Sequence, residues 1–216
     1  MTWLVTLACA LSAAAHLRFV VPRLLEPVLE DDDPAPHYTQ LAPVGHVVFI
    51  ALVVFVAAQV LHAVPMAHFG AWFGYLGAGA ALVWVDLRTT WLPRTLNMIC
   101  GAQVAIGMAW VAVLDWQSAL ASVAGGMAAF ALFHLVWRYT SAFGYGDVRL
   151  AAIVGAMGAL SGLDGWLMAL LCGTLVGAVW GIVHAALQRR RKGPGHFAYG
   201  PALWLGPILA ITVSGW

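Results

Sequence analysis

The sequence has few charged residues. Only 9% of its 216 residues are Asp, Glu, Lys or Arg, whereas 62% are hydrophobic. A soluble globular domain carries about 25% charged residues, and a chain of this length cannot bury so much apolar surface in a water-soluble core. The composition therefore argues against a soluble protein and favours a chain that lies in a lipid bilayer. It gives no reason to expect a nucleic-acid partner.

Patterns that bind metals or form disulfides are also missing. The three cysteines, Cys9, Cys100 and Cys172, lie in apolar segments and form no CxxC pair, so neither a disulfide framework nor a zinc site is expected. The eight histidines are scattered and no HExxH motif occurs, which argues against a metalloprotease. We therefore expect no metal and no cofactor.

Long apolar runs are what the sequence has in abundance. A bilayer core about 30 Å thick requires roughly 20 apolar residues per helix, and backbone polar groups in lipid must be satisfied within the helix. The runs predict an all-α polytopic membrane protein with about eight transmembrane helices, of which the first is a permanent span. The expected spans cover residues 2–21, 44–64, 70–86, 97–114, 118–138, 147–162, 166–187 and 199–215.

Basic residues fall at or beside alternate connections between these spans, and the opposite connections contain none. By the positive-inside rule, the basic connections face the cytoplasm and both termini lie outside. We expect a multi-pass protein of the cell inner (plasma) membrane. The ten basic residues are Arg18, Arg23, Arg88, Arg94, Arg138, Arg149, Arg189, Arg190, Arg191 and Lys192.

Only one connection is long. Residues 22–43 contain five acidic residues among prolines, which is typical of a solvated, irregular segment. We expect two parts: residues 1–69 with two spans and this acidic cytoplasmic loop, and residues 70–216 with six spans. In the seventh span, Gly173 and Gly177 begin a run of glycines spaced four apart, which predicts close approach of a neighbouring helix.

Four acidic residues lie outside the long connection. Asp115 and Asp164 fall in short turns on the external side, where turn chemistry accounts for them. Asp86 and Asp147 each lie at the end of an apolar span, on the cytoplasmic side. An ionisable residue at the membrane edge is costly, and it is therefore a functional candidate.

The residues around both aspartates are specific. Pro93 follows Asp86 by seven residues and separates one helix from the next. Asp147 ends the sequence Gly144-Tyr145-Gly146-Asp147, whose glycines either adopt conformations closed to other residues or let a substrate strand lie close. Two carboxyls brought together form an acid–base pair, because both cannot ionise cheaply. One can take a proton from water, and the other can protonate a leaving nitrogen.

These spacings make the chain resemble the bacterial type IV prepilin (leader) peptidases, which are GxGD-type intramembrane aspartyl proteases. That family pairs an Asp, followed at seven residues by Pro, with a later GxGD, a hydrophobic residue and a basic residue. Asp86 to Pro93 matches the first pattern and Gly144 to Arg149 matches the second. Gly200-Pro201 is similar to a Gly-Pro step that is frequent in the family. The resemblance covers roughly residues 70–215.

The resemblance implies a membrane aspartic endopeptidase. Its substrates would be prepilins or pseudopilins, whose short basic leader precedes a hydrophobic helix and is removed at the cytoplasmic face. Asp86 and Asp147 would form the catalytic dyad that activates water. The residues that would bind substrate or shape the site are Gly144, Gly146, Pro93 and Arg149.

Three departures from the family narrow this expectation. Larger, bifunctional members carry a cysteine-rich, zinc-binding loop after the first span and also N-methylate the new N-terminus. Residues 22–43 contain no cysteine, so we expect a short form without that zinc site, and N-methyltransferase activity is doubtful. Arg94 stands where Asn is frequent, and Arg149 stands where Lys is common; arginine keeps the charge but changes its geometry.

Other interpretations stay open at this point. Asp86 could pair with Arg88 or Arg94 at a helix end, and Asp147 could be a helix N-cap. A proton-coupled transporter also uses membrane aspartates, although it would place them nearer the midplane. A non-catalytic pilus-assembly protein of the same fold is the third alternative. The sequence indicates neither the pilus or secretion system served nor an oligomeric state.

Overall fold

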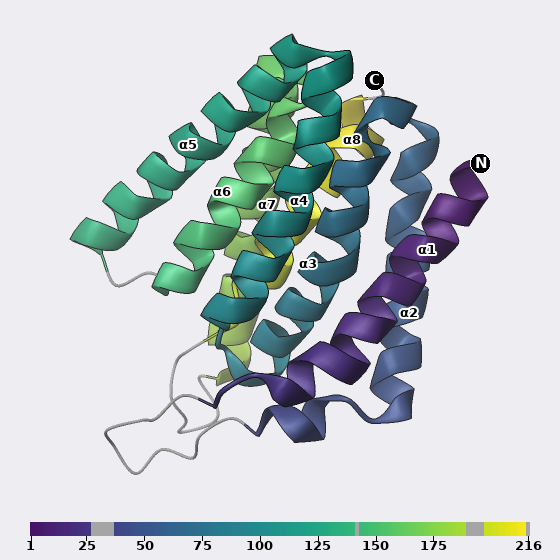
Figure 1. The fold of residues 1–216 in the computed structure, drawn as a ribbon. Coiled ribbons are helices and arrows are strands. Elements are labelled where there is room, and N and C mark those ends of the chain that lie inside the picture. The colour runs from purple at the N-terminus through teal and green to yellow at the C-terminus, as the bar shows by residue number, and fades with distance from the viewer. Residues whose placement is uncertain (27–36, 141–142, 189–196, 215–216) are drawn as a thin grey trace.

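The computed structural model describes residues 1–26, 37–140, 143–188 and 197–214, and within these ranges all regular structure is helical. Eight α-helices form one bundle (Figure 1). They are α1 (Thr2–Ala15), α2 (Val44–Ala57), α3 (Phe69–Thr89), α4 (Arg94–Leu114), α5 (Trp116–Tyr139), α6 (Tyr145–Ala159), α7 (Gly162–Gln188) and α8 (Gly200–Ser214).

The helices confirm an all-α polytopic membrane protein. Six helical segments of the described chain are long and apolar enough to cross a membrane, and α8 is a shorter apolar helix. α6 has 15 residues, which corresponds to about 22 Å at 1.5 Å per residue and is less than the bilayer core of about 30 Å. Two of the eight expected spans are therefore short helices.

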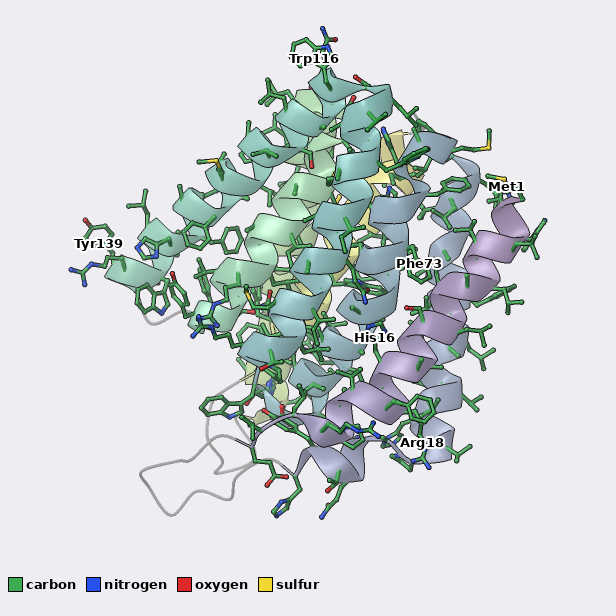
Figure 2. All side chains as sticks on the ribbon, in the orientation of Figure 1. Met1, His16, Arg18, Phe73, Trp116 and Tyr139 are labelled. Atoms are coloured by element: carbon green, nitrogen blue, oxygen red, sulfur yellow. The ribbon has the colours of Figure 1, made fainter. Side chains whose placement is uncertain are left out.

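The helices run alternately in opposite directions. α1, α3, α5 and α7 begin at one end of the bundle and end at the other, and α2, α4, α6 and α8 run the opposite way (Figure 1). Figure 2 shows Met1 and Trp116 toward the first end, and Arg18 and Tyr139 toward the second. We call the second end the basic end, because the described arginines lie at or beside its connections. These are Arg18, Arg23, Arg88, Arg94, Arg138 and Arg149. The predicted basic run 189–192 and the acidic run 30–33 lie outside the described residues.

The described part of the long connection is more ordered than expected. We predicted a solvated, irregular segment over residues 22–43, but Tyr38–Leu41 forms a short 3₁₀ helix. Tyr38, Leu41 and Ala42 are buried, and the guanidinium of Arg18 donates to the carbonyl of Ala42 at 3.3 Å. Tyr38 and Leu41 are three residues apart and so lie on one side of a 3₁₀ turn, which lets both side chains reach the bundle. The division into residues 1–69 and 70–216 stays a prediction.

The central element of the bundle is α3. Every residue from Gly74 to Asp86 is buried, and α3 packs against α1, α4 and α8. Tyr75 and Trp204 join α3 to α8 through reciprocal hydrogen bonds: the Tyr75 hydroxyl donates to the Trp204 carbonyl at 2.7 Å, and the Trp204 indole donates to the Tyr75 carbonyl at 3.2 Å. These bonds set the relative positions of the two helices.

The glycines of α7 face α8 and the segment before it, as their spacing predicted. A Cβ atom at Gly173 would meet the backbone of Leu203 at 3.3 Å, and one at Gly177 would meet the ring of Tyr199 at 2.1 Å. Small residues at such positions let helices approach closely in a membrane, where packing rather than the hydrophobic effect drives association. The approach of α7 therefore fixes where α8 begins.

We expect Gly177→Ala to lower the free energy of unfolding by about 1–3 kcal/mol, because the added methyl group overlaps the Tyr199 ring and forces repacking. Gly45→Ala is the matched control, since a Cβ atom there meets nothing within 4 Å. Denaturation of both purified variants in detergent, followed by circular dichroism, measures the effect. Equal stability of the two variants would contradict the predicted packing of α7 against Tyr199.

Candidate active site

Asp86 is buried in the last turn of α3, at the basic end. Its side chain is 3% exposed, and its Oδ2 atom accepts a hydrogen bond of 2.8 Å from the backbone N–H of Gly200. Gly200 is the first residue of α8, and the N–H groups in the first turn of a helix have no partner within that helix. Among the described residues, neither Arg88 nor Arg94 pairs with Asp86, and Arg88 instead lies over the ring of Trp84.

The helix that carries Asp86 continues beyond the expected end of the span. We predicted that the third span ends at Asp86, but α3 extends one more turn to Thr89. Thr90 ends it in the left-handed region, with φ of 59°, which is unusual for a β-branched residue. Pro93 is the N-cap residue of α4, and its carbonyl accepts from the N–H of Asn97 at 3.0 Å. Pro93 therefore begins α4, as predicted.

Asp147 is the third residue of α6. Its Oδ2 atom accepts a hydrogen bond of 3.1 Å from the backbone N–H of Gly144, and its own N–H donates to the carbonyl of Gly144 at 3.1 Å. Gly144 is therefore the N-cap residue, and Asp147 makes the returning bond of a capping box. The side chain is 7% exposed. Its Oδ1 atom is buried and accepts no hydrogen bond from the described residues.

The two glycines before Asp147 have different roles. Gly144 has φ of −79° and ψ of 161°, which any residue can adopt, so the expectation of a special backbone conformation is wrong at this position. Gly146 is required for close approach, because a Cβ atom there would lie 2.6 Å from the Cβ atom of Leu92. Leu92 belongs to the α3–α4 connection, so this contact joins the two motifs.

We expect Gly146→Ala to destabilise the folded protein by about 1–3 kcal/mol, because its methyl group overlaps Leu92 and separates α6 from the α3–α4 connection. Gly144→Ala is the comparison, since its Cβ atom would lie 3.8 Å from the nearest atom, Asp147 Oδ2. Thermal unfolding in detergent distinguishes them, with a lower midpoint expected for the first variant alone. A lower midpoint for Gly144→Ala would contradict the assignment.

Asp86 and Asp147 lie close enough for the charge of one to act on the other. The start of α8 lies beside both: Gly200 donates to Asp86, and Tyr199, the residue before it, lies near Asp147. The ring of Tyr199 stacks on Phe143, with ring centroids 6.0 Å apart. Two carboxyls from α3 and α6 thus share one buried environment at the basic end, beside the start of α8.

Within the described ranges, Arg149 forms no hydrogen bond or ion pair with either aspartate. Its guanidinium lies 4.8 Å above the ring of Tyr145, a cation–π geometry. Tyr145 in turn contacts Trp137 edge-on, with ring centroids 4.8 Å apart. Arg149 is therefore held at the junction of α5 and α6, two residues beyond Asp147.

Of the other two acidic residues, Asp115 has the turn role predicted for it, whereas Asp164 lies within a helix and not in a turn. Asp115 is the N-cap residue of α5 and accepts from the backbone N–H of Ser118 at 3.2 Å. The hydrogen bonds from the Ser118 hydroxyl and N–H hold the pKa of Asp115 below its usual range. Asp164 is exposed in the first turn of α7, where a negative charge interacts favourably with the helix dipole.

Three contacts of this site were not found from the sequence. Gly200-Pro201 was identified only through the family resemblance, without the hydrogen bond from Gly200 to Asp86. Asn97 is buried and donates from its Nδ2 atom to the carbonyl of Gly146 at 3.2 Å, and Leu92 packs on Gly146. Asn97 did carry a signal, because it is an amide at the beginning of an apolar run.

The chemistry available is that of two neighbouring carboxyls. A pair of this kind can take a proton from a water molecule and return one to a leaving group. No group of three His, Cys, Asp or Glu side chains is placed to hold a metal ion in the described part of the chain.

Comparison with known proteins places both aspartates inside a matched region. The sequence model of the type IV leader peptidase family matches residues 73–182. A prepilin leader peptidase/N-methyltransferase of Escherichia coli (strain K12) is 31% identical over 150 residues, which are 68% of this chain and 64% of that relative. The match thus spans less than two thirds of the relative's length, and no solved structure matches the chain. Since the family match covers half of the chain, the chain belongs to the type IV leader peptidase family.

Proposed function

We propose that the protein is a membrane aspartic endopeptidase that removes the short basic leader from prepilins or pseudopilins. One observation carries the proposal: two buried carboxyls, from α3 and α6, interact at one end of the bundle, within the residues that match the family. Each receives a hydrogen bond from a backbone N–H, which holds its carboxyl in place.

The proposed reaction uses one carboxylate and one protonated carboxyl. The carboxylate takes a proton from water as the water oxygen bonds to the peptide carbon, and the protonated carboxyl donates a hydrogen bond to the carbonyl oxygen. The tetrahedral intermediate then collapses, the carbon–nitrogen bond breaks, and the nitrogen receives a proton from a carboxyl. The Oδ1 atom of Asp147, which accepts no hydrogen bond from the described residues, would bind the water or the carbonyl oxygen. Asp86 and Asp147 are the proposed catalytic residues.

The residues around the dyad hold it in position in this proposal. Gly146 lets the α3–α4 connection pack against the start of α6, and Pro93 begins the helix that follows that connection. Gly144 supplies an N–H to Asp147, and an extended substrate strand would lie against its backbone. Arg149 provides positive charge near the membrane surface, at the junction of α5 and α6.

The proposed location is the inner (plasma) membrane, with the basic end and the two aspartates facing the cytoplasm. The positive-inside rule supports this orientation, because the described arginines gather at the basic end. The basic leader of a substrate would also stay on the cytoplasmic side while its hydrophobic helix lies in the membrane. The cleavage point between them would then lie at the same depth as the dyad. Substrate and protein then meet within the plane of the membrane.

The test is direct cleavage. The purified protein is incubated in detergent or vesicles with a prepilin or pseudopilin precursor, and both fragments are measured by mass spectrometry. We expect one cut between the leader and the hydrophobic helix, no added methyl group, and unchanged cleavage in EDTA. The E. coli relative is the positive control for the substrate.

An uncut precursor, under conditions in which the relative cuts it, would refute the peptidase and leave the non-catalytic assembly protein. Proton-driven uptake into vesicles by the same preparation, without cleavage, would support the transporter instead. Strong inhibition by EDTA would contradict catalysis by the carboxyls alone.

A further inference from the structure

Asn97 is a buried amide in an apolar helix. It lies in the first turn of α4 and is 3% exposed. A polar side chain that loses contact with water is costly unless it forms hydrogen bonds. The Nδ2 atom of Asn97 donates to the carbonyl of Gly146, 49 residues further along the chain, at 3.2 Å. The bond therefore links α4 to the first turn of α6.

The carbonyl that Asn97 binds belongs to the peptide group that leads into Asp147. Because a peptide group is planar, fixing the Gly146 carbonyl also fixes the direction of the Asp147 N–H, which donates to Gly144. The Asp147 carboxyl has an Oδ1 atom without a partner in the described residues. Its Oδ2 atom is held by the N–H of Gly144, so the orientation of the carboxyl follows the first turn of α6, which Asn97 holds through Gly146.

The same part of α4 is connected to Asp86. The α3–α4 connection begins one turn after Asp86, and its Leu92 packs on Gly146 from a second direction. Leu92 and Asn97 together hold the first turn of α6 against the segment that follows Asp86. These two contacts thus partly set the distance between the two carboxyls. Of the two, the hydrogen bond from Asn97 also constrains direction, whereas the packing of Leu92 does not.

We propose that Asn97 is a positioning residue that holds the Asp147 carboxyl at its working distance from Asp86. The inference rests on the proposed peptidase function. It assigns Asn97 no contact with substrate. A displacement of about 1 Å in a catalytic group can lower a rate about 100-fold, so loss of this hydrogen bond is expected to affect turnover more than substrate binding.

The first variant is Asn97→Leu, which keeps the size of the side chain and removes the donor. We expect kcat for leader removal to fall about 10- to 100-fold, with KM changed by less than about twofold. Ser122→Ala is the matched control. Ser122 also donates from a neighbouring helix to a carbonyl of α6, that of Ala156 at 2.7 Å, but nine residues beyond Asp147. We expect its kcat to stay near that of the parent.

The second variant, Asn97→Asp, separates positioning from general stability. A protonated carboxyl can donate to the Gly146 carbonyl, whereas an ionised one cannot. We therefore expect its activity, relative to the parent at each pH, to be higher at pH about 5 than at pH about 8. Asn97→Leu should show no such recovery. A role limited to packing would give the two variants parallel pH profiles.

A readout without substrate completes the test. Labelling of Asp147 by a carbodiimide and an amine, followed by peptide mass, reports the surroundings of its carboxyl. We expect Asn97→Leu to change the labelling rate several-fold relative to Ser122→Ala. If the parent cuts no precursor but this difference is found, the peptidase proposal fails and the positional link stands. Parent-like labelling and parent-like kcat in Asn97→Leu, or equal losses in Ser122→Ala, would overturn the inference.

Discussion

Replacement of either aspartate by asparagine is expected to abolish leader removal, with a fall in rate of about 1,000-fold or more. Asparagine keeps the size of the side chain, but its amide can neither take a proton from water nor donate one as an acid. Asp86→Asn and Asp147→Asn should each have this effect, because the reaction needs both members of the pair. The measurement is the rate of leader release per molecule of purified protein, followed by mass.

The matched control is Asp164→Asn, which changes an exposed acid at the opposite end of the bundle from the dyad. We expect its cleavage rate to equal that of the parent. Thermal unfolding of all three variants checks that none has lost its fold. Cleavage by either dyad variant within about tenfold of the parent, at equal stability, would show that the assigned residue is not catalytic.

Gly200→Ala is expected to have the second-largest effect. A Cβ atom at this position would lie 2.7 Å from Asp86 Oδ2 and 3.3 Å from its Cγ atom, so the carboxyl must turn away and its 2.8 Å hydrogen bond from the Gly200 N–H breaks. A hydrogen bond to a charged group contributes about 1.5–3 kcal/mol. If the reaction depends on that geometry, the cleavage rate should fall roughly 10- to 150-fold.

The control for Gly200→Ala is Gly45→Ala, at a position with nothing within 4 Å of the new atom. Steady-state kinetics of both variants should show a loss of kcat in the first and parent-like values in the second. A Gly200→Ala protein with parent-like kcat would indicate that the contact between α8 and Asp86 is not needed for turnover. Gly200→Ala also distinguishes the role of the Gly200–Asp86 contact from the role of Asn97, because Asn97 acts on Asp147.

Most of the fold could be predicted from the sequence, because lipid imposes a simple rule on backbone polar groups. The eight apolar runs correspond to the eight helices, and the alternation of basic residues corresponds to the two ends of the bundle. Hydropathy shows where the apolar surface stops, which is not always where the helix stops. For this reason the predicted span stops at Asp86, whereas α3 continues to Thr89 and is ended by Thr90 in the left-handed conformation.

The site could be predicted only where it is local in sequence. Pro93 begins α4 and the motif around Asp147 begins α6, because both depend on neighbouring residues. The bond between Gly200 and Asp86 joins residues 114 positions apart, and no local spacing encodes it. Gly146 was expected to matter for its backbone freedom or for a substrate, and the structure adds close contact with Leu92 as a third reason. A glycine alone does not tell which of these applies.

The hydrogen bond from Gly200 to Asp86 also has a consequence for biosynthesis. α3 and α6 are made before α8, and the residues that match the family end at 182. On the proposed function, both aspartates enter the membrane while Asp86 still lacks the N–H group that holds it. We therefore expect the site to be complete only once α8 has been inserted, so that leader removal would follow synthesis of the whole bundle.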